Sequence, residues 1–340
     1  MNRSIRFAVL GLGAAVALVV AAVAFAAYTS PTLRVSYAGT TTNITASASQ
    51  NDDATAVATI YIPSGTTITT SQAPGTQIGT VKAQVQALAL GGALLPLDGK
   101  IIVAPPGAIP AESQAACTQG QTPTATWILV LSAAGQTINL PAYIIPTAGP
   151  EAALGPAKLQ FCLAPPDIPV ASGGATFGAK FLSAALSVNG VFSPVAQGAW
   201  IAFWTPWQAG NGQVNLAGTV VSPAGVAPGA VTVKARKAGA GALVSGVVTQ
   251  GGLPRPGVSV QVWGGKSKAT LKKLGTVRSN AKGAYTFKAK SGSVFQAQAV
   301  AAPTAAPPLC TLLTPQLGGK PCVNPTANGF SAKSGLAPKK

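Results

Sequence analysis

The residue types that carry most enzymatic acid–base chemistry are nearly absent from this chain. It contains no histidine, and aspartate and glutamate together number six in 340 residues. General acids and bases are drawn mainly from these three residue types. We therefore expect no catalytic residues, no metal and no cofactor. Chemistry that uses serine and lysine stays open as an alternative, although no nucleophile elbow or serine–lysine motif with its companion motifs is present.

Cations are plentiful, and they are distributed unevenly along the chain. All six acidic residues precede residue 170, whereas residues 231–340 hold 16 of the 23 lysines and arginines. Such an asymmetry predicts a polyanionic partner for the second part of the chain. The densest group lies in one expected loop and its flanks, and consists of Lys266, Lys268, Lys272, Lys273 and Arg278. We predict that it contacts an anionic polymer or polysaccharide of the cell envelope; nucleic acid is the weakest candidate, because no nucleic-acid-binding motif is present.

Tryptophan offers a second kind of binding chemistry. Three of the five tryptophans lie between Ala199 and Trp207. Alternation along a strand places Trp200 and Trp204 on one face, and we interpret these two as core residues because aromatic side chains carry large core burial. Exposed aromatic rings could instead bind sugar, and the candidates for such a site are Trp207 and Trp263.

Four cysteines are present, and their use depends on the compartment. Arg3 and Arg6 precede an apolar stretch from Phe7 to Phe25, and residues 24–26 read Ala-Phe-Ala. This pattern predicts a signal peptide over residues 1–27, with an uncleaved membrane anchor as the alternative. Either interpretation places the remaining chain outside the cytoplasm, in the cell envelope or the extracellular space, and the anchor would be its one contact with a membrane.

An even number of cysteines in an exported chain predicts disulfides. Three pairings are open for four cysteines. Sequence proximity favours Cys117–Cys162 and Cys310–Cys322.

The elements that must position these residues are expected to be strands. Short apolar stretches broken by Gly, Pro, Asn and Ser recur at intervals of roughly 8–12 residues, which is typical of β-sandwiches. Clear examples are residues 56–62, the alternating stretch 81–87, residues 126–131 and residues 158–163. No helical periodicity of useful length follows residue 27. The predicted fold class is therefore all-β, with immunoglobulin-like or transthyretin-like sandwich domains in tandem.

We expect four parts along the chain: the signal or anchor at 1–27, a β-sandwich region at 32–237 that could comprise two subdomains, a second sandwich at 238–303, and a basic tail rich in Pro and Gly at 304–340. Residues 238–241 read Ala-Gly-Ala-Gly, which is typical of a flexible link. The tail would carry the Cys310–Cys322 loop and be mobile beyond residue 324.

One region carries motifs of a known family. They are Gly246-Val247-Val248, the turn Pro254-Arg255-Pro256-Gly257, the alternating stretch 258–262, and the run from Thr276 to Phe287 with Asn280, Gly283 and Tyr285. Over residues 242–303 the chain resembles the carboxypeptidase regulatory-like domain, a transthyretin-like or SpaA-like sandwich of a wider carbohydrate-binding-like group. The resemblance implies an accessory, non-catalytic module for folding, spacing or adhesion, and it transfers no ligand-binding residue.

These observations predict an exported structural or adhesive protein whose basic C-terminal module contacts anionic envelope material. The alternatives are a surface protein that binds carbohydrate through Trp207 or Trp263, and an exported enzyme with serine or lysine chemistry.

Overall fold

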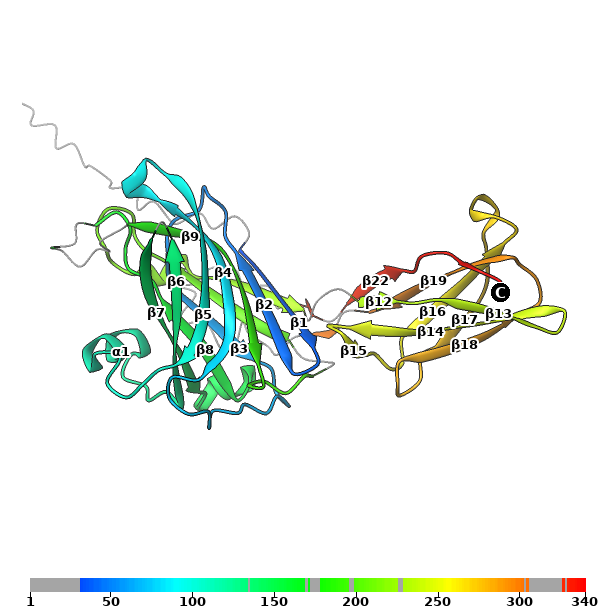
Figure 1. Ribbon diagram of the computed structural model, residues 1–340, viewed down its shortest axis with the longest axis horizontal. Coiled ribbons are helices and arrows are strands. Elements are labelled where there is room, and N and C mark those ends of the chain that lie inside the picture. Colours follow the sequence, from blue (N-terminus) through cyan, green and yellow to red (C-terminus); the bar gives the residue numbers. More distant parts are fainter. Residues whose placement is uncertain are drawn as a thin grey trace, which may run out of the picture.

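The computed structural model describes residues 31–133, 135–168, 171, 178–195, 199–225, 229–302, 304, 305, 326, 327 and 329–340. The expected signal segment and the Cys310–Cys322 pair lie outside these residues. The described chain is predominantly β and forms two units that lie end to end (Figure 1). Across the described ranges, no helix is both long enough and apolar enough to span a bilayer.

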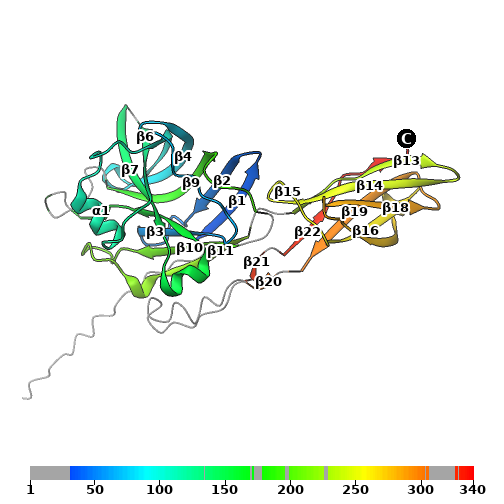
Figure 2. The ribbon, with the colours of Figure 1, turned by 90° about the horizontal axis from the view of Figure 1, so that it is seen from below.

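The first unit is one 11-stranded antiparallel sheet, where the sequence predicted a sandwich. Its strand order is β1-β2-β9-β4-β5-β6-β7-β8-β3-β10-β11. Ser222 Oγ of the last strand donates a hydrogen bond to the carbonyl oxygen of Pro31, directly before the first strand, so the sheet is rolled around its own core (Figure 2). The strands are β1 (Thr32–Ala38), β2 (Thr41–Ser47), β3 (Thr55–Ile62), β4 (Gln77–Ala87), β5 (Ala93–Val103), β6 (Ala125–Ala133), β7 (Gln136–Pro146), β8 (Ala157–Cys162), β9 (Ala179–Asn189), β10 (Ala199–Pro206) and β11 (Val220–Gly225).

Alternation of side chains explains why this sheet can roll. Successive side chains of a strand point to opposite faces, so an apolar residue at every second position gives one apolar face. In β1, for example, Leu33, Val35 and Tyr37 are buried, and in β2 Ile44 and Ala46 are buried. Rolling the sheet brings these inner faces together into one hydrophobic core.

Short helical segments accompany the first sheet. α1 (Ala111–Thr118) lies outside the rolled sheet, beside β7 and β8 (Figure 1). The 3-10 segments of this unit are η1 (Leu88–Leu90), η2 (Gly149–Leu154) and η4 (Leu216–Gly218). β8 is buried on both faces because α1 and η2 pack against its outer side.

The second unit is a sandwich of two five-stranded sheets. One sheet joins β12, β13, β15 and β18 to β14, and the other has the order β17-β16-β19-β22 with β23 also paired to β19. Alternating residues such as Val244, Val260, Val262 and Phe295 fill the space between the sheets. The strands are β12 (Gly229–Val231), β13 (Lys234–Ala238), β14 (Gly241–Gln250), β15 (Leu253–Pro254), β16 (Ser259–Gly265), β17 (Lys272–Arg278), β18 (Ala284–Ala289), β19 (Val294–Ala301), β22 (Phe330–Lys333) and β23 (Ala337–Pro338), with η5 (Lys268–Thr270) between β16 and β17.

The strand pairing differs from two sequence expectations. Residues 238–241, expected as a flexible link, are the hairpin turn between β13 and β14, with Ala238 opposite Gly241. The last residues, expected as part of a mobile tail, form β22 and β23 on the edge of β19, where Ala337 is buried. A further pair, β20 (Thr304–Ala305) and β21 (Thr326–Ala327), forms a separate two-stranded sheet.

Candidate binding surfaces

Four of the six acidic residues make structural contacts in the first unit: Asp52, Asp98, Glu151 and Asp167. Glu151 of η2 accepts two hydrogen bonds from Lys158 Nζ of β8, at 3.0 and 2.8 Å, and one from the Tyr61 hydroxyl at 2.8 Å. Burial, reinforced by the Glu151 charge, raises the pKa of Tyr61 well above its ordinary value. Asp52 accepts a hydrogen bond from the backbone N–H of Ser49 and closes a turn. No group of three or more acidic or cysteine side chains with metal-binding proximity occurs in the described ranges.

Four of the five predicted basic residues lie together. Lys266, Lys268, Lys272 and Lys273 are exposed on η5 and its flanks, where β16 passes into β17. Arg278 is exposed at the opposite end of β17, six residues and roughly 20 Å along the strand from Lys272. Its guanidinium donates to the carbonyl oxygen of Gly257 at 3.3 Å, so it belongs to a different surface.

Strand register adds further cations that we did not single out from the sequence. Ala242 pairs with both Lys237 and Ala289, and Gly265 pairs with Val294, so the β13–β14 turn, the β18–β19 connection and η5 occupy one end of the sandwich. An isolated bridge between Ala235 and Lys339 brings the chain terminus to the same end. We call this surface the basic end. Its exposed members are Arg236, Lys237, Lys266, Lys268, Lys272, Lys273, Lys288, Lys290, Lys339 and Lys340.

The basic end has no acidic counterpart nearby. No aspartate or glutamate follows Asp167, and both ion pairs found among the described residues lie in the first unit. One cation of the second unit is different: Arg255 is buried and its Nε donates to Gln250 Oε1 at 2.9 Å. Burial lowers the pKa of Arg255. Arg255 is therefore a structural cation, whereas those of the basic end are free to meet a ligand.

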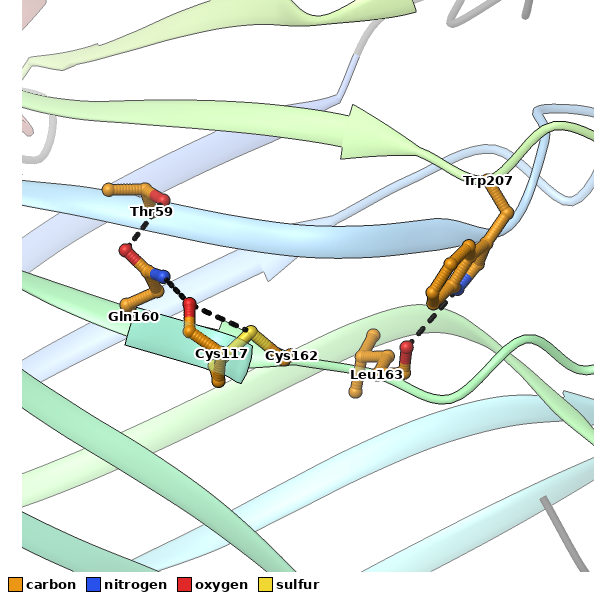
Figure 3. The surroundings of a disulfide bond; sticks show 6 residues. All are labelled: Thr59, Cys117, Gln160, Cys162, Leu163 and Trp207. Atoms are coloured by element: carbon orange, nitrogen blue, oxygen red, sulfur yellow. Dashed lines mark hydrogen bonds between the residues drawn. A yellow bond between two sulfur atoms is a disulfide. The ribbon is translucent and has the colours of Figure 1, made fainter. Parts of the chain in front are cut away.

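The two tryptophans proposed for sugar binding lie in different units. Trp207 is half-buried, and its Nε1 donates to the carbonyl oxygen of Leu163 at 3.1 Å beside the disulfide (Figure 3). Trp263 is half-exposed on β16, opposite Lys273 and Gln296. These positions form no shared platform. Trp200 and Trp204 are almost completely buried, which confirms their interpretation as core residues.

The structure forms the Cys117–Cys162 disulfide that sequence proximity favoured. It joins the last turn of α1 to the end of β8, and Gln160 Nε2 donates to the carbonyl oxygen of Cys117 on the same surface (Figure 3). The bond therefore fixes an outer helix to the sheet.

The chain matches no protein-family model, and no curated protein is significantly similar to it.

Proposed function

We propose that the chain is an exported, non-catalytic protein of the cell envelope that holds anionic polymer with its basic end. The observation that carries the proposal is the convergence of ten exposed lysines and arginines at one end of a sandwich that contains no acid. Four separate chain segments contribute to this surface: the β13–β14 hairpin, η5 with its flanks, the β18–β19 connection and the last two residues.

Elementary electrostatics favours a polymeric anion over a small one. Cations that lie within a Debye length, about 8–10 Å at physiological salt, repel one another, and an extended polyanion relieves that repulsion at several sites at once. Each polymer charge that replaces a bound counterion makes binding more dependent on salt. Polymers with a phosphate, sulfate or carboxylate on each repeat carry such a series of negative charges.

The non-catalytic part of the proposal is supported by composition. The chain lacks histidine, and four of its six acids, Glu151, Asp52, Asp98 and Asp167, already accept hydrogen bonds or form ion pairs. The motif resemblance of residues 242–303 to the carboxypeptidase regulatory-like domain also favours an accessory, adhesive module. Export is supported by the N-terminal sequence pattern and by the disulfide.

The test is retention of the purified protein on immobilised poly(glycerol phosphate) across a salt series. We expect binding at low salt and release by several hundred millimolar salt. Replacing Lys268 and Lys273 with Gln should reduce the slope of log affinity against log salt by about two, because each lost phosphate contact removes about one unit.

A matched control removes the same charge from the other end of the sandwich. Arg278→Gln with Lys282→Gln lowers the net charge equally. Both residues are exposed; Arg278 directly precedes the turn at residues 279–283, and Lys282 lies within it. This control should change the slope by much less than the test pair. Equal effects of the two pairs, or no retention at low salt, would overturn the proposal.

A further inference from the structure

The rolled sheet of the first unit encloses an apolar cavity. Its volume is about 390 Å³, within the range of small-molecule sites. Strands β2 to β10 all contribute to its wall. The lining residues include Ala46, Ala58, Ala83, Phe181, Ala184 and Trp204.

The cavity exists because small side chains meet in register on three neighbouring strands. Ala184 of β9 lies opposite Ala46 of β2 on one side and opposite Ala83 of β4 on the other. All three line the cavity. Across the lumen Ala58 of β3 contributes a fourth small side chain, so space is left where larger residues would have filled the core.

One end of the lumen is closed by aromatic rings. Phe192 packs edge-to-face against Trp127 and Trp200, with ring centroids 6.0 and 5.4 Å apart. Trp200 Nε1 also donates to the Tyr37 hydroxyl at 3.0 Å. In the part of the chain that the structure describes, this leaves the opposite end, where β7 begins and β6 and β8 end, for a ligand to enter.

That open end carries exposed apolar side chains. Ile138 of β7 lines the cavity and is 37% exposed, and Asn139 beside it is also exposed. Leu88 and Leu90 of η1 follow β4 at the same end, and Leu94 opens β5; all three are exposed, Leu90 by 60%. Large apolar groups gathered at the surface are typical of a site that receives apolar material.

The lining restricts the chemistry of the ligand. Among the described residues, no lysine, arginine, aspartate or glutamate lines the cavity, and its polar lining side chains are those of Thr55 and Asn139. An ionised group could not be buried there without an uncompensated desolvation cost. We propose that this cavity binds the single long acyl chain of a lipid, with the polar head held at the mouth near Asn139. The site lies in the first unit, and the proposal is independent of the basic end.

The experiment titrates the purified protein with palmitate and, separately, with a palmitoyl lysophospholipid, by isothermal calorimetry and native mass spectrometry. We expect saturable binding of one acyl chain per protein, with octanoate at least tenfold weaker. Binding of palmitate alone identifies a free fatty acid as the source, and binding of the lysophospholipid identifies a membrane lipid. The absence of saturable binding of either would overturn the proposal.

Ala184→Phe should fill the cavity and weaken binding at least tenfold. The matched control is Ala185→Phe, which adds the same ring to the exposed neighbouring position of β9 and should leave binding unchanged. A second measurement covers the case in which Ala184→Phe does not fold. In the wild-type protein, a brominated fatty acid should quench the fluorescence of Trp204, because Trp204 lines the cavity. Trp204→Phe should remove that part of the quenching. Unchanged binding in a folded Ala184→Phe protein, or quenching independent of Trp204, contradicts the assignment.

Discussion

Buried tyrosines act as neutral hydrogen-bond donors in both units. The Tyr61 hydroxyl donates to Glu151 at 2.8 Å, and the Tyr285 hydroxyl donates to the carbonyl oxygen of Thr232 at 2.6 Å. Both side chains are at least 95% buried. Burial raises the pKa of each phenol above its ordinary value of 10.0, because a phenolate loses its hydration there.

This burial predicts alkaline destabilisation. Above pH 10 these tyrosines release protons in the unfolded state but keep them in the folded state, so the unfolded state binds fewer protons and the free energy of unfolding falls as pH rises. Each such tyrosine should contribute a loss of about 1 kcal/mol per pH unit between its unfolded and folded pKa. Urea unfolding at pH 9 and pH 11 measures this loss.

The contribution of one residue follows from comparison with a phenylalanine variant. Tyr61→Phe and Tyr285→Phe should each be less stable than the wild type at pH 9, since a hydrogen bond is lost, and should each lose less stability between pH 9 and pH 11. If the wild type and both variants lose the same free energy of unfolding between pH 9 and pH 11, these tyrosines do not cause the alkaline destabilisation.

Among the elements, α1 depends most on tertiary bonds. It has eight residues and no side-chain cap at Pro110, and isolated helices of this length are marginal in water. The Cys117–Cys162 bond and the hydrogen bond from Gln160 hold it on β8. The disulfide closes a loop with a sequence separation of 45 residues.

Removing this bond should destabilise the first unit. Cys117→Ala with Cys162→Ala should lower the free energy of unfolding by about 4 kcal/mol in the loop-entropy model. Urea unfolding monitored by tryptophan fluorescence measures the change, because Trp127, Trp200 and Trp204 lie in this core. A stability equal to that of the wild type would show that the unfolded chain gains no conformational entropy when the disulfide is removed.

Individual strands were predictable from the sequence, but the form of the sheet was not. Alternation and apolar runs correctly predicted strands at residues 56–62, 81–87 and 126–131, which lie in β3, β4 and β6, and at residues 158–163, which lie in β8 except for the last residue. The neighbours of these strands come from distant parts of the chain; β9, for example, inserts between β2 and β4. Such pairing depends on long-range register, which local periodicity does not contain.

The same limit applies to the candidate surfaces. The lysines around η5 stood out because they are close in sequence, whereas Lys288, Lys290 and Lys339 join them only through strand pairing. The row formed by Ala46, Ala83 and Ala184 was not predictable from the sequence either, because its members come from three strands. β22 was missed because its pairing partner, β19, ends 29 residues earlier, and a short segment such as Phe330–Lys333 carries little periodicity.

On the scale of the whole molecule, the described residues bring the two units into contact where β1 meets the turn between β14 and β15. The backbone N–H of Tyr37 at the end of β1 donates to the carbonyl oxygen of Gly251 at 2.8 Å, and Leu253 packs against the core of the first unit. This contact lies at the end of the sandwich opposite the basic end. The arrangement presents the basic end at the far tip of the molecule, where a polymer can reach it without meeting the first unit (Figure 1).

Gly252 makes this contact possible. Its φ is +84°, and a Cβ at this position would lie 2.2 Å from the carbonyl oxygen of Tyr37, which is far inside van der Waals contact. Gly252→Ala should therefore separate the two units while each stays folded. Small-angle X-ray scattering should show an increased radius of gyration and a longer maximum dimension, and circular dichroism should keep its β signature.

Gly257→Ala separates the effect of the contact from that of backbone strain. Gly257 also has a positive φ, +73°, but a Cβ there would meet no atom within 4 Å. Both variants carry the cost of an alanine in the left-handed region, about 1–2 kcal/mol, and only Gly252→Ala adds the clash with Tyr37. The scattering profile of Gly257→Ala should match that of the wild type. Matching profiles for all three proteins would show that the Tyr37–Gly251 contact does not hold the units together, and that the position of the basic end is set by the connecting chain alone.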